Sequence, residues 1–116
     1  MVYNGCRMLY PKEGIPLNSK IKSKEADFLF DAILQLQNQE ECYMFFEDLC
    51  TVQELKALSQ RLVVAKMLSD GRVYSDIVKA TGASTATISR VNRSLEYGCD
   101  SYSMVFGRMD EEKKQV

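Results

Sequence analysis

The chain has 116 residues, of which 46% are hydrophobic and 27% are charged, and its formal net charge is −1 at pH 7. This length and composition are typical of one globular domain, and they exclude a low-complexity or collagen-like chain. Histidine is absent and the four cysteines form no C-x-x-C pair, so the sequence offers no ligand set for zinc or for a metal-dependent active site.

Residues 1–22 show no apolar period and contain Gly5, Pro11, Gly14 and Pro16. Such a segment is typical of an arm that is flexible or becomes ordered only against a partner. It lacks the basic and then apolar layout of a signal peptide, and no apolar stretch approaches the ~20 residues that a membrane-spanning helix needs. We therefore expect a cytoplasmic protein without membrane contact, whose cysteines are reduced and serve as small apolar groups.

Two helices rich in apolar residues are predicted between residues 23 and 49. Ser23 is the N-cap candidate of the first, and Asn38 followed by Glu41 resembles a capping box at the start of the second. Inward-facing candidates in the second helix are Cys42, Tyr43, Phe45, Phe46 and Leu49. Together the two helices carry more large apolar side chains than a thin monomer can easily bury, which favours a subunit interface. The alternative is that these side chains fill the domain's own core.

A long third helix is predicted from Thr51 to Gly71. Thr51 and Glu54 have the S/T-x-x-E spacing of a capping box, in which each residue accepts from the backbone N–H of the other. Arg61 lies outside the apolar face of this helix. The inward-facing candidates are Leu55, Leu58, Leu62, Ala65 and Leu68.

Residues 74–95 have the pattern of two short helices joined by a tight turn, which is a helix-turn-helix. Gly82 stands where the first helix must end and a positive φ is needed, and Ser84 is the N-cap candidate of the second helix. The inward-facing candidates are Ile77, Val78, Thr81, Ile88, Val91 and Leu95.

The opposite face of the second helix suits the major groove of DNA. Arginines can pair with phosphates or guanine acceptors, hydroxyls can donate to bases, and small methyl groups can touch thymine. The candidate DNA contacts are Ser84, Thr85, Ala86, Ser89, Arg90, Asn92 and Arg93 on this helix and Lys79 on the preceding one. The alternative interpretation is a solvated helix face with two ordinary arginines.

The overall charge hides an asymmetry along the chain. Residues 1–50 carry five basic and eight acidic side chains, whereas residues 51–108 carry eight basic and five acidic ones. The positive excess therefore lies in the half that contains the helix pair, which favours an anionic partner for that half.

A last short helix is predicted after Gly98, with Asp100 as its N-cap. Strand patterns are negligible, so the predicted fold is all-α with about six helices. We place one domain at residues 23–109, between the N-terminal arm and a charged C-terminal tail at residues 110–116.

Several of these motifs together resemble the Trp repressor superfamily, most closely the Trp-repressor-like YerC/YecD group of Firmicutes. The resemblance covers roughly Lys24 to Phe106. The residues that carry it are Leu49-Cys50-Thr51, Leu58, Gln60-Arg61, Gly71, the run Gly82-Ala83-Ser84-Thr85-Ala86-Thr87-Ile88-Ser89-Arg90, and Ser94-Leu95.

The resemblance implies a six-helix, intertwined homodimer with two DNA-binding motifs related by a two-fold axis. In the repressor the base contacts correspond to Thr85, Ala86 and Ser89. The first motif helix of the repressor supplies basic side chains to DNA, but the matching positions here are Ser75 and Val78. The operator sequence of the repressor therefore cannot be transferred to this chain.

The repressor binds tryptophan between two arginines that match Arg61 and Arg90, with its amino group near Ser94 and the carbonyls around Cys50. Val91 replaces the glycine against which the indole lies, and a β-branched side chain occupies that space. We therefore favour no effector, with tryptophan or another small effector as alternatives.

The sequence thus predicts a transcriptional regulator, most simply a repressor, that binds double-stranded DNA as a dimer. An enzyme is not expected, because we find no nucleophile with a partner base, no paired carboxylates and no phosphate-binding loop. The alternative is a helical protein-interaction module without DNA readout, in which the acidic first half binds a partner.

Overall fold

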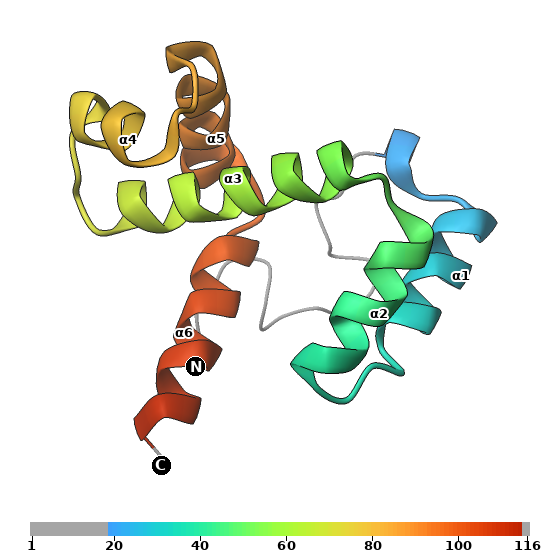
Figure 1. Cartoon of the computed structure of the whole chain (residues 1–116). Helices are drawn as coiled ribbons and strands as arrows, with labels where there is room; N and C mark the ends of the chain where they lie inside the picture. The colour runs from blue at the N-terminus through green and yellow to red at the C-terminus, as the bar shows by residue number, and fades with distance from the viewer. Residues whose placement is uncertain (1–18, 115–116) are drawn as a thin grey trace. The chain divides into compact units, whose positions relative to one another are not determined.

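The computed structural model describes residues 19–114, and the regular structure in this range is entirely helical (Figure 1). The elements are the short 3-10 helix η2 (Ser19–Ile21) and the helices α1 (Lys24–Ile33), α2 (Gln39–Leu49), α3 (Val52–Ser69), α4 (Tyr74–Thr81), α5 (Thr85–Tyr97) and α6 (Ser101–Lys114). The predicted all-α fold of six helices is confirmed. Within the described range no helix is both long and apolar enough to cross a membrane. Positions 1–18 of the predicted arm lie outside the described residues.

The chain divides into two compact units at a point within α3. The N-terminal unit contains α1, α2 and the start of α3, up to Leu58, and the C-terminal unit contains the rest of α3 with α4, α5 and α6. The single domain expected at residues 23–109 therefore spans two parts, each with its own contacts.

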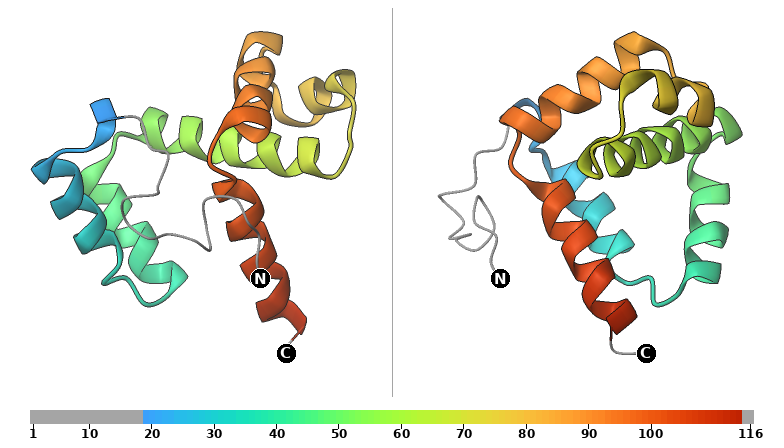
Figure 2. Two further views of the ribbon diagram at one scale, coloured as in Figure 1. Left: turned by 180° about the vertical axis from the view of Figure 1, so that it is seen from behind. Right: turned by 90° about the vertical axis from the view of Figure 1, so that its left-hand side faces the viewer.

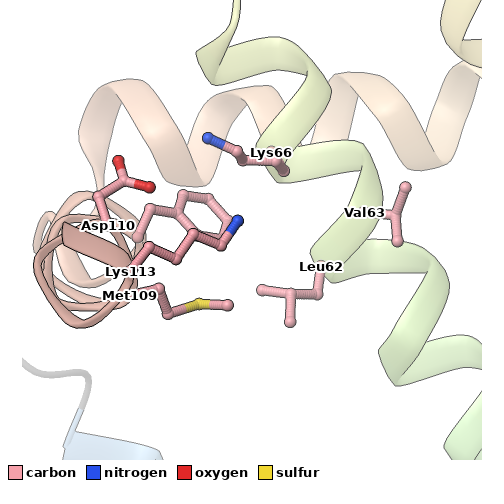
Figure 3. Close-up of a pocket in the computed structure, with 7 residues that line it drawn as sticks. Leu62, Val63, Lys66, Met109, Asp110 and Lys113 are labelled. Carbon is pink, nitrogen blue, oxygen red and sulfur yellow. The ribbon is translucent and has the colours of Figure 1, made fainter. Parts of the chain in front are cut away.

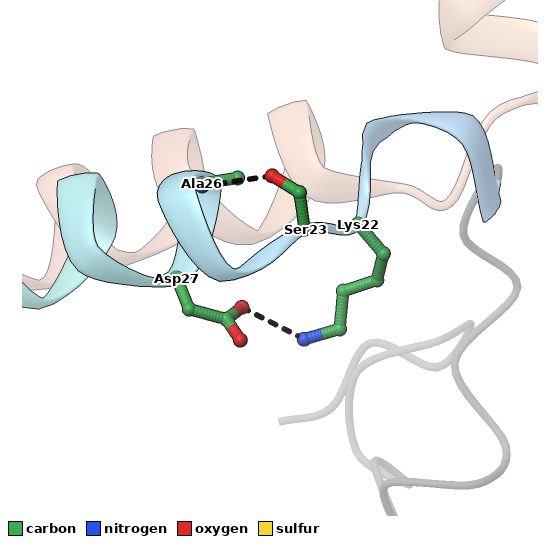
Figure 4. Close-up of polar contacts among 4 residues, drawn as sticks. All are labelled: Lys22, Ser23, Ala26 and Asp27. Atoms are coloured by element: carbon green, nitrogen blue, oxygen red, sulfur yellow. Dashed lines mark hydrogen bonds and ion pairs between the residues drawn. The ribbon is translucent and has the colours of Figure 1, made fainter.

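The N-terminal unit begins at the cap of α1. The Ser23 hydroxyl accepts a hydrogen bond from the Ala26 N–H at 2.9 Å, and Lys22 pairs with Asp27 at 3.0 Å (Figure 4). Both partners of this ion pair are more than half exposed, so it adds little to stability. The N-cap predicted at Ser23 is confirmed.

The next two helix starts also follow the local sequence. The Asn38 side chain accepts from the Glu41 N–H at 2.9 Å, but Glu41 reaches back to the Gln37 N–H, one residue before the cap. Thr51 and Glu54 form the full reciprocal capping box, with distances of 3.0 and 2.8 Å. Such caps fix where a helix begins, because they satisfy N–H groups that have no partner inside the helix.

Neither α1 nor α2 contains a buried residue. The Phe28 side chain is 77% exposed, and Tyr43 and Leu49, which the pattern predicted to face inward, are 65% and 49% exposed. Two short helices cannot fully enclose their own apolar faces, so among the described residues the face predicted to be inward is only partly covered, with Phe45 and Phe46 half-buried.

The apolar core lies in the C-terminal unit, where α4 and α5 pack on one side of α3 and α6 extends on the other (Figures 1 and 2). On α3 the buried residues are Val64 and Ala65, whereas Leu62 is 43% exposed. The predicted inward face of α3 is therefore only partly right, because apolar residues occur all around this helix. The buried core among the described residues is Val64, Ala65, Ile77, Ala83, Ile88, Val91 and Phe106.

The last helix is longer than the short helix predicted from the sequence. It follows Asp100, which takes a left-handed backbone conformation with φ of 64°, and continues through most of the segment interpreted as a tail. Phe106 anchors α6 to the core, stacks on Tyr102 at 6.0 Å and lies 5.4 Å from the Lys66 ammonium.

Candidate nucleic-acid interface

The turn between α4 and α5 follows the sequence prediction closely. Gly82 takes the left-handed conformation, with φ of 74°, and its N–H donates to the Val78 carbonyl at 2.8 Å. Ser84 then caps α5, its hydroxyl accepting from the Thr87 N–H at 3.1 Å. The predicted helix end and helix start are both confirmed.

Side-chain hydrogen bonds also hold this turn. The Thr81 hydroxyl donates to the Ile77 carbonyl at 2.7 Å and accepts from the Ala83 N–H at 3.1 Å. The Gln60 amide, on α3, donates to the Thr81 carbonyl at 3.1 Å. The sequence pattern did not predict this contact of Gln60, because a polar pair 21 positions apart leaves no periodic signal.

One face of α5 is fixed in the core. Ile88 is fully buried and Val91 is 3% exposed, so the inward register predicted for these two positions is confirmed. The opposite, solvent-exposed face, which we call the recognition face, consists of Thr85, Ala86, Ser89, Arg90 and Arg93. Of the other candidate DNA contacts, Ser84 and Lys79 are exposed and Asn92 is half-buried.

The cations at this surface are available to an anionic partner. Ion pairs among the described residues include Lys22–Asp27, Lys66–Asp70 and Arg72–Asp76, and none of these involves Arg90, Arg93 or Lys79. The first acidic side chain of α5 is Glu96, near its C-terminal end. The N-terminus of α5 adds the partial positive charge of the helix dipole. Binding of DNA by these residues stays a prediction.

The residues of the predicted effector pocket are distributed over both units. Arg61 is half-buried on α3 and Arg90 is exposed, both in the C-terminal unit, whereas Cys50 belongs to the N-terminal unit. The Ser94 hydroxyl donates to the Arg90 carbonyl at 3.5 Å, within α5. Val91 belongs to the apolar core, where its isopropyl group fills space. This set also stays a prediction.

A shallow apolar groove lies between α3 and α6 in the C-terminal unit (Figure 3). It encloses about 200 Å³. Its lining residues are Leu62, Val63, Lys66, Phe106, Met109, Asp110 and Lys113. Among the described residues, no group of three or more histidine, cysteine or acidic side chains could hold a metal ion.

The fold and this surface define a class: a small all-α protein that displays the polar face of a short helix while the other face is buried. Residues 24–110 match the family described as Trp repressor protein. The chain belongs to this family, so the resemblance inferred from the sequence is confirmed.

Individual relatives agree with this assignment. The uncharacterised protein YerC of Bacillus subtilis (strain 168) is 55% identical over 92 residues, which cover 79% of this chain and 88% of YerC. A crystal structure of a TrpR-like protein from Eubacterium eligens ATCC 27750 superposes with a TM-score of 0.77 at 57% identity, covering 80% of this chain and 96% of that one. A candidate Trp repressor from Staphylococcus aureus gives a TM-score of 0.77 at 58% identity, covering 79% and 92%.

Proposed function

We propose that this protein is a sequence-specific regulator of transcription, acting most simply as a repressor, that binds double-stranded DNA through α5. The observation that carries the proposal is the recognition face: Arg90 and Arg93 are exposed and make no ion pair within the described residues, while the core fixes the helix behind them. Membership of the Trp repressor family supports the same function.

The recognition face contains groups for two kinds of DNA contact. Arg90 and Arg93 reach phosphates or guanine acceptors, and such phosphate contacts supply affinity and fix orientation. Ser89 offers a hydroxyl to base edges, while Ala86 and Thr85 offer methyl groups to thymine. The small side chains at the N-terminal end of α5 allow close approach to the groove.

We further propose that the active form is a homodimer. The helices α1 and α2 have no buried residue, and the C-terminal unit also leaves the groove between α3 and α6 open. Exposure of such apolar surfaces to water is unfavourable. A second copy of the chain has the same surfaces, and the two copies can cover each other in a symmetric dimer. Two recognition faces related by a two-fold axis would match a palindromic site.

No small-molecule effector is needed for this function in our proposal. Val91 is part of the apolar core that positions α5, so its side chain fills space that a ligand in this place would otherwise occupy. Tryptophan or another small effector at Arg61 and Arg90 is the alternative. The proposed regulator is not an enzyme and acts in the cytoplasm.

Replacing Arg93 by alanine is expected to reduce the salt dependence of DNA binding. Removal of one phosphate contact should lower the slope of log affinity against log salt by about 0.9. Fluorescence anisotropy with a labelled random-sequence duplex, measured at salt concentrations from about 50 to about 200 mM, gives this slope.

The matched control is Arg108→Ala, which removes another exposed arginine, on α6. The control should keep the wild-type slope. An unchanged slope in Arg93→Ala, or equal changes in both variants, would show that the recognition face does not meet phosphates.

The second candidate function is a protein-interaction module. The observation that favours it is the composition of α1 and α2, which together carry one lysine and seven carboxylates. A wild-type protein that binds duplex DNA with no salt dependence, or not at all, would favour this module over the regulator.

A further inference from the structure

Gln60 makes the side-chain hydrogen bond that joins α3 to the end of α4. Its amide nitrogen donates to the Thr81 carbonyl at 3.1 Å, and the contact is partly buried. Thr81 is the last residue of α4, so its carbonyl has no acceptor role inside that helix. Since only the nitrogen of the amide can donate to a carbonyl, the contact also fixes the orientation of the Gln60 side chain.

Thr81 in turn is hydrogen-bonded to the residue that precedes the cap of α5. Its hydroxyl accepts from the Ala83 N–H at 3.1 Å, and Ala83 directly precedes the cap residue Ser84. At Gly82 a Cβ atom would meet nothing within 4 Å, so this one position of the turn has no side-chain packing, whereas Ala83 beside it is 2% exposed in the core. The hydrogen bonds of Gln60 and Thr81 therefore restrain the turn at Gly82, next to the packed Ala83.

We propose that Gln60 is a positioning residue for DNA recognition: it sets where the turn, and with it the N-terminal end of α5, lies relative to α3. This inference rests on the proposed function. Long arginine side chains can follow a small displacement of α5 and keep their phosphate contacts. Hydrogen bonds from short side chains such as Ser89 to base edges need accurate placement, so sequence preference is the property that Gln60 supports.

The first test replaces Gln60 by methionine, which has similar length but no donor. The full-length wild-type protein is used to select its preferred duplex from a random library, and affinity is then measured for this duplex and for a scrambled one. Loss of one hydrogen bond should lower the ratio of the two affinities by about threefold to tenfold, with affinity for the scrambled duplex unchanged.

The matched control is Gln53→Met, the same substitution at an exposed position of α3. This control should leave the affinity ratio unchanged. A Gln60→Met protein that melts at a lower temperature but keeps the wild-type ratio would show that Gln60 only stabilises the fold, and the proposal would be wrong.

Gln60→Glu tests the same bond by a change of pH. At pH about 7.5 the carboxylate can only accept, so the ratio should fall as in Gln60→Met. Near pH about 3.5, below the ordinary glutamate pKa of about 4.3, the carboxyl group is largely protonated and can donate to the Thr81 carbonyl, so the ratio should return toward that of the wild type at the same pH. Absence of this recovery would overturn the proposal even if Gln60→Met fails to fold.

Amide hydrogen exchange in the free protein gives a readout that needs no DNA. The Ala83 N–H should exchange faster in Gln60→Met than in the wild type and in Gln53→Met, because its acceptor Thr81 loses its connection to α3. If the wild type selects no DNA sequence, the proposed function fails. Unchanged exchange at Ala83 instead contradicts the restraint by Gln60 itself.

Discussion

A Phe30→Asp variant is expected to lose its dimer fraction and its thermal stability together. Phe30 is 56% exposed in the single chain and lies on α1, where no residue is buried. In the proposed dimer a second subunit covers this ring, so the variant would place a carboxylate in an apolar interface. That should cost about 3–5 kcal/mol, which corresponds to a dissociation constant at least about a hundredfold higher.

Sedimentation and thermal melting test this prediction at a protein concentration of about 10–50 µM. This concentration lies above a nanomolar-to-micromolar dissociation constant, so the wild type should be associated. The wild type should sediment as a dimer, and its melting temperature should rise with protein concentration. Phe45→Asp on α2 should behave like Phe30→Asp. The control Gln35→Asp adds the same charge at an exposed polar position between α1 and α2 and should remain dimeric. A stable, folded wild-type monomer at these concentrations would refute the shared interface.

A Val91→Gly variant is expected to lose about 3 kcal/mol of folding free energy. Val91 is 3% exposed and packs in the core with Ile88 and Val64, so removing its side chain leaves a cavity as well as a helix-interior glycine. Denaturant unfolding measures the loss. Ala57→Gly is the matched control, because Ala57 is exposed on α3 and its replacement should cost only about 1 kcal/mol of helix propensity.

The same variant tests the proposal that tryptophan is not an effector. Pressing an indole against the Val91 isopropyl group should cost about 1–3 kcal/mol, a tenfold to hundredfold loss of affinity. Calorimetry with tryptophan at about 1 mM, which detects binding free energies of about −4 kcal/mol, should give no binding for the wild type. Binding gained only by Val91→Gly would identify the valine as the block, whereas tight binding by the wild type would refute the proposal.

The sequence by itself determined the features that depend on neighbouring residues. Ser23, Thr51 with Glu54, and Ser84 cap helices where the local pattern predicted them, because an N-cap side chain bonds to N–H groups only two or three residues away. Gly82 takes the positive φ that ends α4. The inward positions of α5 also followed from period alone, since its large aliphatic residues, Ile88, Val91 and Leu95, lie on one face.

The tertiary structure decided everything that depends on distant parts of the chain. The buried face of α3 was predicted only in part: Ala65 is buried as expected, but α3 has apolar residues on several faces and only its neighbours select Val64. The contact from Gln60 to Thr81 was not predicted for a related reason: the carbonyl at the end of α4 can accept from any donor that the fold brings near. The exposed apolar faces of α1 and α2 are visible only in the folded chain, because a sequence shows how much apolar surface there is but not whether one chain covers it.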